Sequence, residues 1–313
     1  MALPVITPDK IIPMEQVLML IYGRTGVGKT TLAGTAKNAI VFDCERGSYR
    51  SIRSANVLDI PNIETATKYA DDPDLAAYDT VIVDSFYGLI QLSIDYLHRT
   101  NPTMMQRDGT PHLKGWGTVT QSVVRLLEKF INSGKDVVCI SHLSTSKKKG
   151  SDEDFYSPEI QGGARKFVEK MFSFIGYLSN EKEGLVLSFL ADSHKEYKNS
   201  HEALGSYIVP NVNQNPNFLA EIIHTAKQNV SAGTEKQQKA AAGQVEWRGK
   251  IEASKVLADF ESLRESLMSE DGLPEYTVQV LKTALLKKAK TLGFEVKDGK
   301  FVAGSKGKEG DAV

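Results

Sequence analysis

One stretch near the N-terminus combines the residue types that bind a polyphosphate. Residues 23–30 read Gly-Arg-Thr-Gly-Val-Gly-Lys-Thr and fit the pattern Gly-x-x-x-x-Gly-Lys-Ser/Thr. Glycines let backbone N–H groups wrap a phosphate closely, Lys29 would place a cation on the outer phosphates, and Thr30 would offer its hydroxyl to Mg²⁺. We therefore expect ATP and Mg²⁺ to be bound by Gly23, Arg24, Thr25, Gly26, Val27, Gly28, Lys29, Thr30 and Thr31.

Two apolar stretches that end in acidic residues supply the rest of this chemistry. Residues 80–83 lead into Asp84, whose carboxylate would hold the Mg²⁺ shell through water. Residues 39–42 lead into Asp43 and, two positions later, Glu45. A carboxylate there would orient and deprotonate an attacking water, a role we assign to Glu45 with Asp43 as the competing candidate. Such a base distinguishes a hydrolysing ATPase from a kinase.

These side chains need strands that end at a common edge. Short apolar runs alternate with segments of helical length, and the runs are nearly free of polar residues, as strands buried on both faces are. The runs cover residues 17–22, 39–42, 81–83, 137–140, 174–178 and 185–190. The pattern predicts an α/β fold with a mostly parallel sheet flanked by helices, in which carboxyl ends of the strands open toward the phosphate site.

The character of the chain changes near residue 228. We expect a core over residues 1–227, a polar linker over 228–245, a small helical module over 246–300 and a disordered tail over 301–313. The module shows apolar residues at helical spacing in two segments, which predicts two amphipathic helices.

Composition excludes several classes of protein. The 313 residues include 38 Lys plus Arg and 39 Asp plus Glu, so a bulk basic footprint for nucleic acid is absent. Two cysteines, Cys44 and Cys139, rule out a disulfide framework and a four-ligand zinc site. Without a signal peptide or a membrane-spanning apolar stretch, we expect a cytoplasmic protein with no membrane partner.

Several of these segments resemble the RecA-like recombinase ATPases over about residues 17–215. Residues 41–45, Val-Phe-Asp-Cys-Glu, look like the family's Phe-x-Asp-Ala-Glu, and residues 82–85, Ile-Val-Asp-Ser, look like its magnesium-aspartate strand. Residues 162–163 are the Gly-Gly that opens a helix after the family's mobile DNA-binding loop. The closest overall likeness is to short phage-encoded RecA-like ATPases with a compact core and a small C-terminal extension.

The resemblance implies a RecA-like P-loop NTPase core and a function. Glu45 would activate water, and His142, where bacterial recombinases carry Gln, would sense the γ-phosphate. The protein would be an ATPase stimulated by single-stranded DNA, acting as a ring or filament of identical subunits in phage DNA recombination or annealing. It would work in the host cytoplasm, with a single-strand DNA-binding protein as a partner.

Two long connections, residues 100–117 and 143–161, mix cations with aromatics in the way that phosphate contact and base stacking require. The expected DNA contacts are Arg107, Lys114, Trp116, Lys147, Lys148, Lys149, Arg165 and Lys166. A solvated charge run for the lysines and core packing for Trp116 are the alternatives.

By its position after residues 185–190, the pair Lys195 and Lys198 resembles the family's basic pair that reaches the ATP of the neighbouring subunit; ordinary surface lysines are the alternative. A helicase or helicase-loader ATPase is the second hypothesis for the whole protein. A P-loop small-molecule kinase and a nucleotide-gated scaffold are further alternatives.

Overall fold

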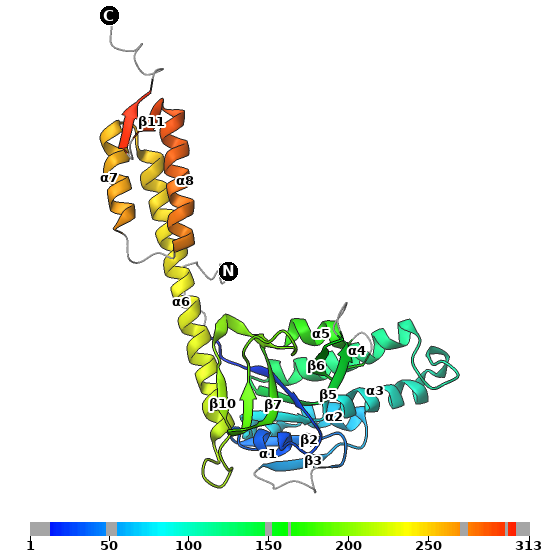
Figure 1. The fold of residues 1–313 in the computed structure, drawn as a ribbon. Coiled ribbons are helices and arrows are strands. Elements are labelled where there is room, and N and C mark those ends of the chain that lie inside the picture. The colour runs from blue at the N-terminus through cyan, green and yellow to red at the C-terminus, as the bar shows by residue number, and fades with distance from the viewer. Residues whose placement is uncertain are drawn as a thin grey trace, which may run out of the picture. The chain divides into compact units, whose positions relative to one another are not determined.

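The computed structural model describes residues 13–47, 55–147, 152–161, 164–269, 275–297 and 300–304 (Figure 1). Side chains are not described at residues 166–169, 233–242, 244–245 and 275–277. The chain forms two compact units, a core over Pro13–Val230 and a C-terminal unit from Ser231 onward.

A mostly parallel sheet forms the centre of the core. Within the described residues it has ten strands, in the order β10-β8-β7-β1-β5-β4-β2-β3, with β6 added to β5 and β9 to β7. Pairs among β3, β2, β4, β5, β1 and β7 are parallel, whereas β8 and β10 run antiparallel. The strands are β1 Leu18–Gly23, β2 Ala39–Asp43, β3 Asn56–Asp59, β4 Thr80–Asp84, β5 Asp136–Lys147, β6 Asp154–Pro158, β7 Phe174–Glu181, β8 Gly184–Ser188, β9 Lys198–Asn199 and β10 Ser206–Ile208.

Helices cover both faces of this sheet, because alternate residues of a strand point to opposite sides. Leu20 and Tyr22 of β1 pack with α2, α3 and α4, whereas Met19 and Ile21 pack with α1 and the start of α6. The helices are α1 Lys29–Ala33, α2 Ile63–Ala70, α3 Phe86–Thr100, α4 Leu113–Asn132, α5 Ala164–Met171 and α6 Phe218–Ala253, with 3₁₀ turns at Pro73–Ala77, Pro102–Met104 and Ser200–Glu202. The predicted α/β core is confirmed.

Strand order decides which residues meet. Because β5 lies between β1 and β4, the register pairs Gly23 with His142 and Ile140 with Asp84. The next pair along the sheet, β4 with β2, sets Asp84 opposite Asp43. The carboxyl ends of these strands therefore lie side by side at one edge of the sheet, as a parallel sheet requires.

Neither long connection is a loop throughout. In residues 100–117, helix α4 already begins at Leu113, so Lys114 and Trp116 are helical. In residues 143–161, β5 continues to Lys147 and pairs antiparallel with β6, which makes a β-hairpin. The sequence did not predict these strands, because the hairpin is polar and has no apolar run. They are held by backbone pairing and by Tyr156, which packs against the core.

The C-terminal unit packs around Phe260. It contains the end of α6, helices α7 Leu257–Met268 and α8 Glu275–Thr291, and a hairpin of β11 Phe294–Lys297 with β12 Lys300–Ala303. The expected linker at residues 228–245 is helical, as part of α6. Residues 301–303, assigned to the tail from the sequence, belong instead to β12, because Phe301 is buried with its ring centroid 5.6 Å from that of Phe260.

None of the helices in the described part of the chain is sufficiently long and apolar to cross a membrane.

Candidate functional site

The phosphate-binding loop joins β1 to α1. Gly28 has φ 103°, a left-handed conformation that a residue with a side chain adopts only with strain. The helix begins at the next residue, so Lys29 is fixed at the mouth of the loop. Its Nζ donates to the carbonyl oxygens of Gly23 at 2.8 Å and Arg24 at 2.9 Å. The loop therefore curls around a single buried ammonium group.

Burial lowers the pKa of Lys29, and the nearby carboxylates of Asp84 and Glu45 oppose that shift. The Lys29 ammonium group thus lies among carboxylates and loop carbonyl oxygens, and a bound phosphate would be a further anionic partner for it. This is the electrostatic setting that the sequence pattern predicts for Lys29.

Thr30 and Asp84 meet at the base of the loop. The hydroxyl of Thr30 donates to Oδ2 of Asp84 at 2.6 Å, across 54 positions of sequence. Burial raises the pKa of Asp84, as do the charges of Glu45 and Asp43, while the hydrogen bond from Thr30 and the charge of Lys29 lower it. A hydroxyl and a crowded carboxylate at one point are the hard oxygen ligands that suit Mg²⁺, and a divalent charge there would relieve the carboxylate repulsion.

The loop after β2 places Glu45 against the start of α3. Oδ1 of Asp43 accepts hydrogen bonds from the backbone N–H of Glu45 at 3.3 Å and of Gly47 at 3.1 Å, which holds the turn. The hydroxyl of Ser85 donates to Oε1 of Glu45 and accepts from the N–H of Gly88 at 3.2 Å. Asp43 therefore shapes the turn, whereas Glu45 extends from it with its carboxylate oriented.

A glycine permits this contact. A Cβ at position 88 would lie 2.8 Å from Cγ of Glu45 and 2.9 Å from the carbonyl oxygen of Cys44. Any side chain at this position would displace the turn that carries Glu45. The first turn of α3 is thus part of the support for the carboxylate.

His142, at the end of the core part of β5, connects Glu45 to the phosphate-binding loop. Its Nε2 lies 3.1 Å from Oε1 and 3.3 Å from Oε2 of Glu45, and its Nδ1 lies 3.4 Å from Oγ1 of Thr25. The hydrogen bond with Glu45 raises the pKa of His142 against the effect of burial. The same bond is the main cause of the lowered pKa of Glu45, with Ser85 adding to it and burial opposing it.

These side chains surround one cavity of about 400 Å³. It brings together most of the predicted site and is lined by Thr25, Gly26, Gly28, Lys29, Thr30, Thr31, Asp43, Glu45, Gly47, Asp84, Ile140 and His142. Gly23 is buried at the end of β1, and Arg24 and Val27 line a different pocket. The cavity combines phosphate donors, oxygen ligands for a cation and an oriented carboxylate, which together could bind a nucleoside triphosphate and activate water.

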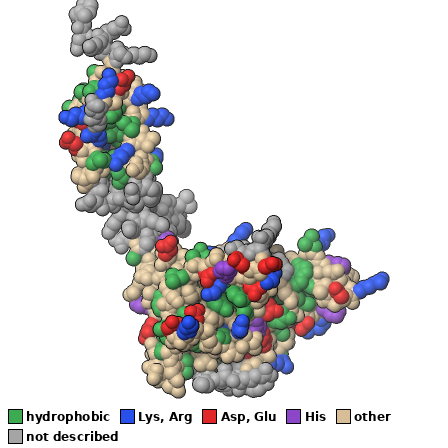
Figure 2. Space-filling model, in the orientation of Figure 1, with side chains coloured by type: hydrophobic (Ala, Val, Ile, Leu, Met, Phe, Trp, Pro, Cys, Tyr) green, Lys and Arg blue, Asp and Glu red, His purple; other side chains and the backbone are tan. Residues whose placement is uncertain are grey.

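The expected DNA contacts are dispersed. Arg107 is exposed on the connection from α3 to α4 and Lys114 is exposed in the first turn of α4, whereas Trp116 is half-buried against the core. None of the three is among the described residues that line the cavity. On the face of the core seen in Figure 2, Lys and Arg side chains are interspersed with Asp and Glu.

The basic run of the β5–β6 hairpin is only partly described. Lys147 pairs with Asp154 at 2.9 Å and donates to the carbonyl oxygen of Asp152 at 2.7 Å, which agrees at this residue with the alternative of a solvated charge run. Lys148 and Lys149, and the side chain of Lys166, lie outside the described residues. Arg165 forms an ion pair with Glu196 at 2.6 Å.

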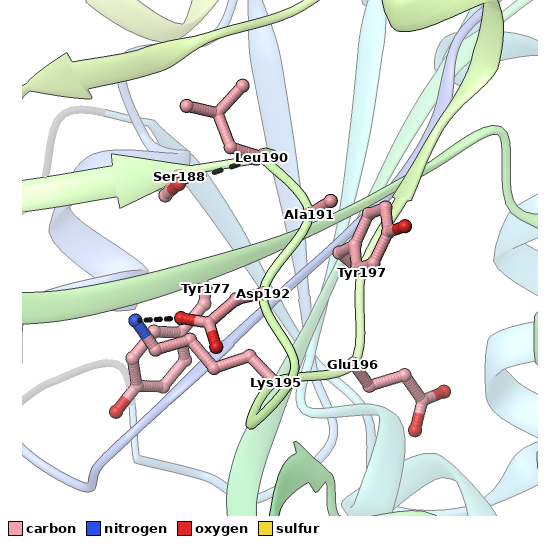
Figure 3. A pocket seen from close by; sticks show the side chains of 8 residues that line it. All are labelled: Tyr177, Ser188, Leu190, Ala191, Asp192, Lys195, Glu196 and Tyr197. Carbon is pink, nitrogen blue, oxygen red and sulfur yellow. Dashed lines mark hydrogen bonds and ion pairs between the residues drawn. The ribbon is translucent and has the colours of Figure 1, made fainter.

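The lysine pair expected to reach a neighbouring subunit contacts its own chain, and Figure 3 shows Lys195 of this pair beside Asp192. Nζ of Lys195 lies 3.1 Å from Oδ2 of Asp192 and 5.1 Å from the centroid of the Tyr177 ring. Nζ of Lys198 donates to the carbonyl oxygen of Lys170 at 3.4 Å, and burial lowers its pKa.

The sequence predicted no role in the site for Ser85 or Gly88. Ser85 follows the magnesium-type aspartate and is the N-cap of α3, a position where serine accepts from the helix N–H groups. That local signal predicts a cap. The contact with Glu45 depends on the pairing of β2 with β4, which the local sequence does not show.

A comparison with protein families agrees with this geometry. Residues 15–204 match a family model described as an AAA domain. The match covers the phosphate-binding loop, the loop with Glu45, the strands of Asp84 and His142, and the β5–β6 hairpin. No curated protein matches the chain. Because the match covers more than half of the chain, the protein belongs to this AAA domain family and is an AAA-type P-loop NTPase.

Proposed function

We propose that the protein is an ATPase that binds single-stranded DNA and acts as a homo-oligomer in DNA recombination or annealing. The observation that carries this proposal is the chain of contacts from Thr25 through His142 to Glu45. It connects the phosphate-binding loop and the expected base to β5, and the same strand continues into the β5–β6 hairpin.

The hydrolytic step follows from the positions of the side chains. The loop N–H groups and Lys29 would bind the phosphates, with ATP as the substrate. Glu45 would orient a water and take its proton, since its carboxylate lies at the same cavity and is fixed by Ser85 and His142. Mg²⁺ held by Thr30, and through water by Asp84, would neutralise phosphate charge.

Coupling to DNA is supported by the hairpin. A ligand that shifts the hairpin would move β5 and thus His142, whose two ring nitrogens face Thr25 and Glu45. His142 would in this way report the state of the γ-phosphate to the hairpin, and the hairpin would in turn adjust Glu45. We therefore propose that single-stranded DNA raises ATP turnover.

The charge distribution supports assembly. A net charge of −1 gives one chain no overall excess of positive charge, and Lys147 and Arg165 are already paired with carboxylates. Local cations such as Arg107 and Lys114 would bind DNA tightly only when several subunits line them up along a strand. The likeness to phage-encoded RecA-like ATPases supports the same view, with a single-strand DNA-binding protein as a proposed partner and Lys195 and Lys198 as proposed contacts to a neighbouring ATP.

Binding and assembly can be tested together. Fluorescence anisotropy with a labelled single strand, at low salt with a non-hydrolysable ATP analogue, should show saturable binding that weakens as salt is raised. Electron microscopy of the same sample should show rings or filaments. Monomers without affinity for the strand would overturn the proposal.

Three other outcomes would favour a different function. Directional displacement of a paired strand by the purified protein would favour the helicase or helicase-loader function. Transfer of phosphate to a nucleoside would favour the kinase. ATP binding without hydrolysis, unchanged in Glu45→Gln, would favour a nucleotide-gated scaffold.

A further inference from the structure

A second pocket lies on the other side of the phosphate-binding loop. It has a volume of about 380 Å³, large enough for one nucleotide. Its walls come from the loop, from the middle of β6 and from the second half of β7. Its lining residues are Arg24, Thr25, Gly26, Val27, Tyr156, Tyr177, Leu178, Ser179 and Asn180. Only Thr25 and Gly26 among the described residues line both this pocket and the nucleotide cavity.

Two tyrosine rings form a fixed aromatic wall. The rings of Tyr156 and Tyr177 lie within 6° of parallel, with centroids 6.2 Å apart. The Tyr177 ring also packs against that of Tyr22, at 5.1 Å between centroids, and against the ammonium group of Lys195 (Figure 3). Both rings are half-buried, so part of each remains accessible to a ligand.

The backbone around Tyr156 is equally restrained. Its N–H donates to the carbonyl oxygen of His194 at 2.8 Å, and its carbonyl oxygen accepts from the N–H of Glu196 at 2.8 Å. Little conformational freedom would therefore be lost when a flat ligand stacks on these rings, which favours binding.

The remaining walls supply a cation and an amide. Arg24 is exposed, and its guanidinium forms no ion pair with any described residue. Burial raises the pKa of Tyr177, while the positive charges of Lys195 and Arg24 oppose the shift, so positive charge reaches the ring. Asn180 is exposed and offers an amide donor and acceptor, as recognition of a base edge requires.

We propose that this pocket binds one nucleotide of a single strand of DNA. The base stacks on Tyr156 and Tyr177, Asn180 contacts its edge, and Arg24 pairs with the adjoining phosphate. The inference rests on the proposed function, because it names where that strand contacts the core.

The position of the pocket gives the strand a direct route to catalysis. Thr25 forms the wall between the two pockets and lies 3.4 Å from Nδ1 of His142. Tyr156 stands on the hairpin that extends from the strand of His142. A base in the second pocket would thus contact both the phosphate-binding loop and the hairpin.

The test separates stacking from phosphate contact. The full chain, with a non-hydrolysable ATP analogue at low salt, is titrated into labelled oligodeoxythymidine and into a strand of equal length made of abasic units. Stacking predicts that the wild type binds the base-bearing strand about 5- to 150-fold more tightly. Tyr177→Leu should lose most of this preference while its affinity for the abasic strand stays the same, and Tyr177→Phe should keep it.

Matched controls come from the same core. Tyr207 is another half-buried tyrosine, on β10, and Tyr207→Leu should keep the preference. Asn180→Ala should weaken binding of the base-bearing strand by about 2- to 10-fold. Asn213→Ala, which changes another exposed asparagine, should not. Thermal unfolding verifies that each variant is folded, and the exposed position 180 tests the pocket even if Tyr177→Leu is unstable.

The results distinguish failure of the proposed pocket from failure of the proposed function. If the wild type prefers bases and both Tyr177→Leu and Asn180→Ala keep that preference, the second pocket is not the stacking site, although the proposed function stands. Equal affinity of the wild type for the two strands also overturns the pocket alone. If neither strand binds while ATP is hydrolysed, DNA binding itself is wrong.

Discussion

Replacing Glu45 by glutamine removes the proton acceptor and changes little else. Gln is isosteric, so one side-chain oxygen still accepts from Ser85 and can still contact His142. The carboxylate of the wild type is ionised at neutral pH, because the hydrogen bond with His142 lowers the pKa of Glu45. A positioned base contributes about 10²- to 10⁴-fold to a rate, so kcat of Glu45→Gln should fall by that factor.

At about 1.36 kcal/mol for each factor of ten, this is an increase of about 2.7 to 5.4 kcal/mol in the activation barrier. ATP affinity should be retained or slightly improved, since the substitution removes a negative charge from the phosphate cavity. Phosphate release at saturating Mg²⁺-ATP measures kcat, and equilibrium binding of a fluorescent ATP analogue measures affinity.

Asp43→Asn is the matched control on the same strand end. The Asp43 carboxylate accepts from the backbone N–H groups of Glu45 and Gly47 through one oxygen, which the amide of Asn retains. We expect a loss of less than about tenfold, from a loosened turn. A loss in Asp43→Asn equal to or larger than that in Glu45→Gln would show that the assignment of the base is mistaken.

Three further substitutions test the support for this site. Asp84→Asn should raise the Mg²⁺ concentration for half-maximal ATPase activity by about 10- to 100-fold, because the ligand loses its charge. Gly88→Ala should lower kcat and destabilise the core by about 1 to 3 kcal/mol, because the new methyl group would collide with the turn of Glu45. Gly117→Ala should do neither, because a Cβ at position 117 would have no atom within 4 Å. The Glu45 carboxylate raises the pKa of His142, so the imidazolium form persists above the ordinary pKa of about 6.5 and holds the Glu45 carboxylate by its hydrogen bond. Because loss of that proton frees the carboxylate, kcat should rise as pH passes through the raised pKa of His142. His142→Gln should abolish that rise.

Each of these has a clear contrary result. An unchanged Mg²⁺ requirement in Asp84→Asn would remove this carboxylate from the cation site. Equal unfolding temperatures and rates for Gly88→Ala and the wild type would mean that the turn moves freely. A kcat that rises with pH equally in His142→Gln would assign the titration to another group.

The sequence predicted those parts of the site in which a reactive or phosphate-binding residue lies at or just after the end of a strand. The phosphate-binding loop, Asp84 and Glu45 each follow an apolar run, and a parallel sheet places such run ends at one edge. These are local patterns with a topological consequence, and they require no knowledge of distant contacts. His142 was predicted instead by the resemblance to the RecA-like ATPases, and the structure places it at the same cavity.

The contacts between elements were harder to predict. Ser85 and Glu45 are 40 positions apart, and Tyr22 donates to the carbonyl oxygen of Tyr156 across 134. No local pattern marks such pairs, so neither the support of Glu45 nor the tyrosine pocket could be predicted from the sequence. The hairpin β5–β6 was missed for a related reason: its strands are polar and are defined by their pairing with one another.

The C-terminal unit shows the limit of helical periodicity. Apolar spacing predicted the helix at α8 correctly, but the first predicted helix, with apolar residues from Trp247 to Leu267, is divided into the end of α6 and α7 by a break at residues 254–256. The run Phe-Val-Ala at 301–303 is too short to show an alternation. Its burial against Phe260 and Phe294, with which it shares a cluster, is what makes it a strand rather than a tail.

The most direct test of the account is the rate of phosphate release from Mg²⁺-ATP at low salt, measured with and without single-stranded DNA. The account predicts hydrolysis by the wild type that increases with the strand, and none by Lys29→Ala under either condition. Equal turnover with and without the strand would contradict the coupling through His142, and activity retained in Lys29→Ala would contradict the site itself.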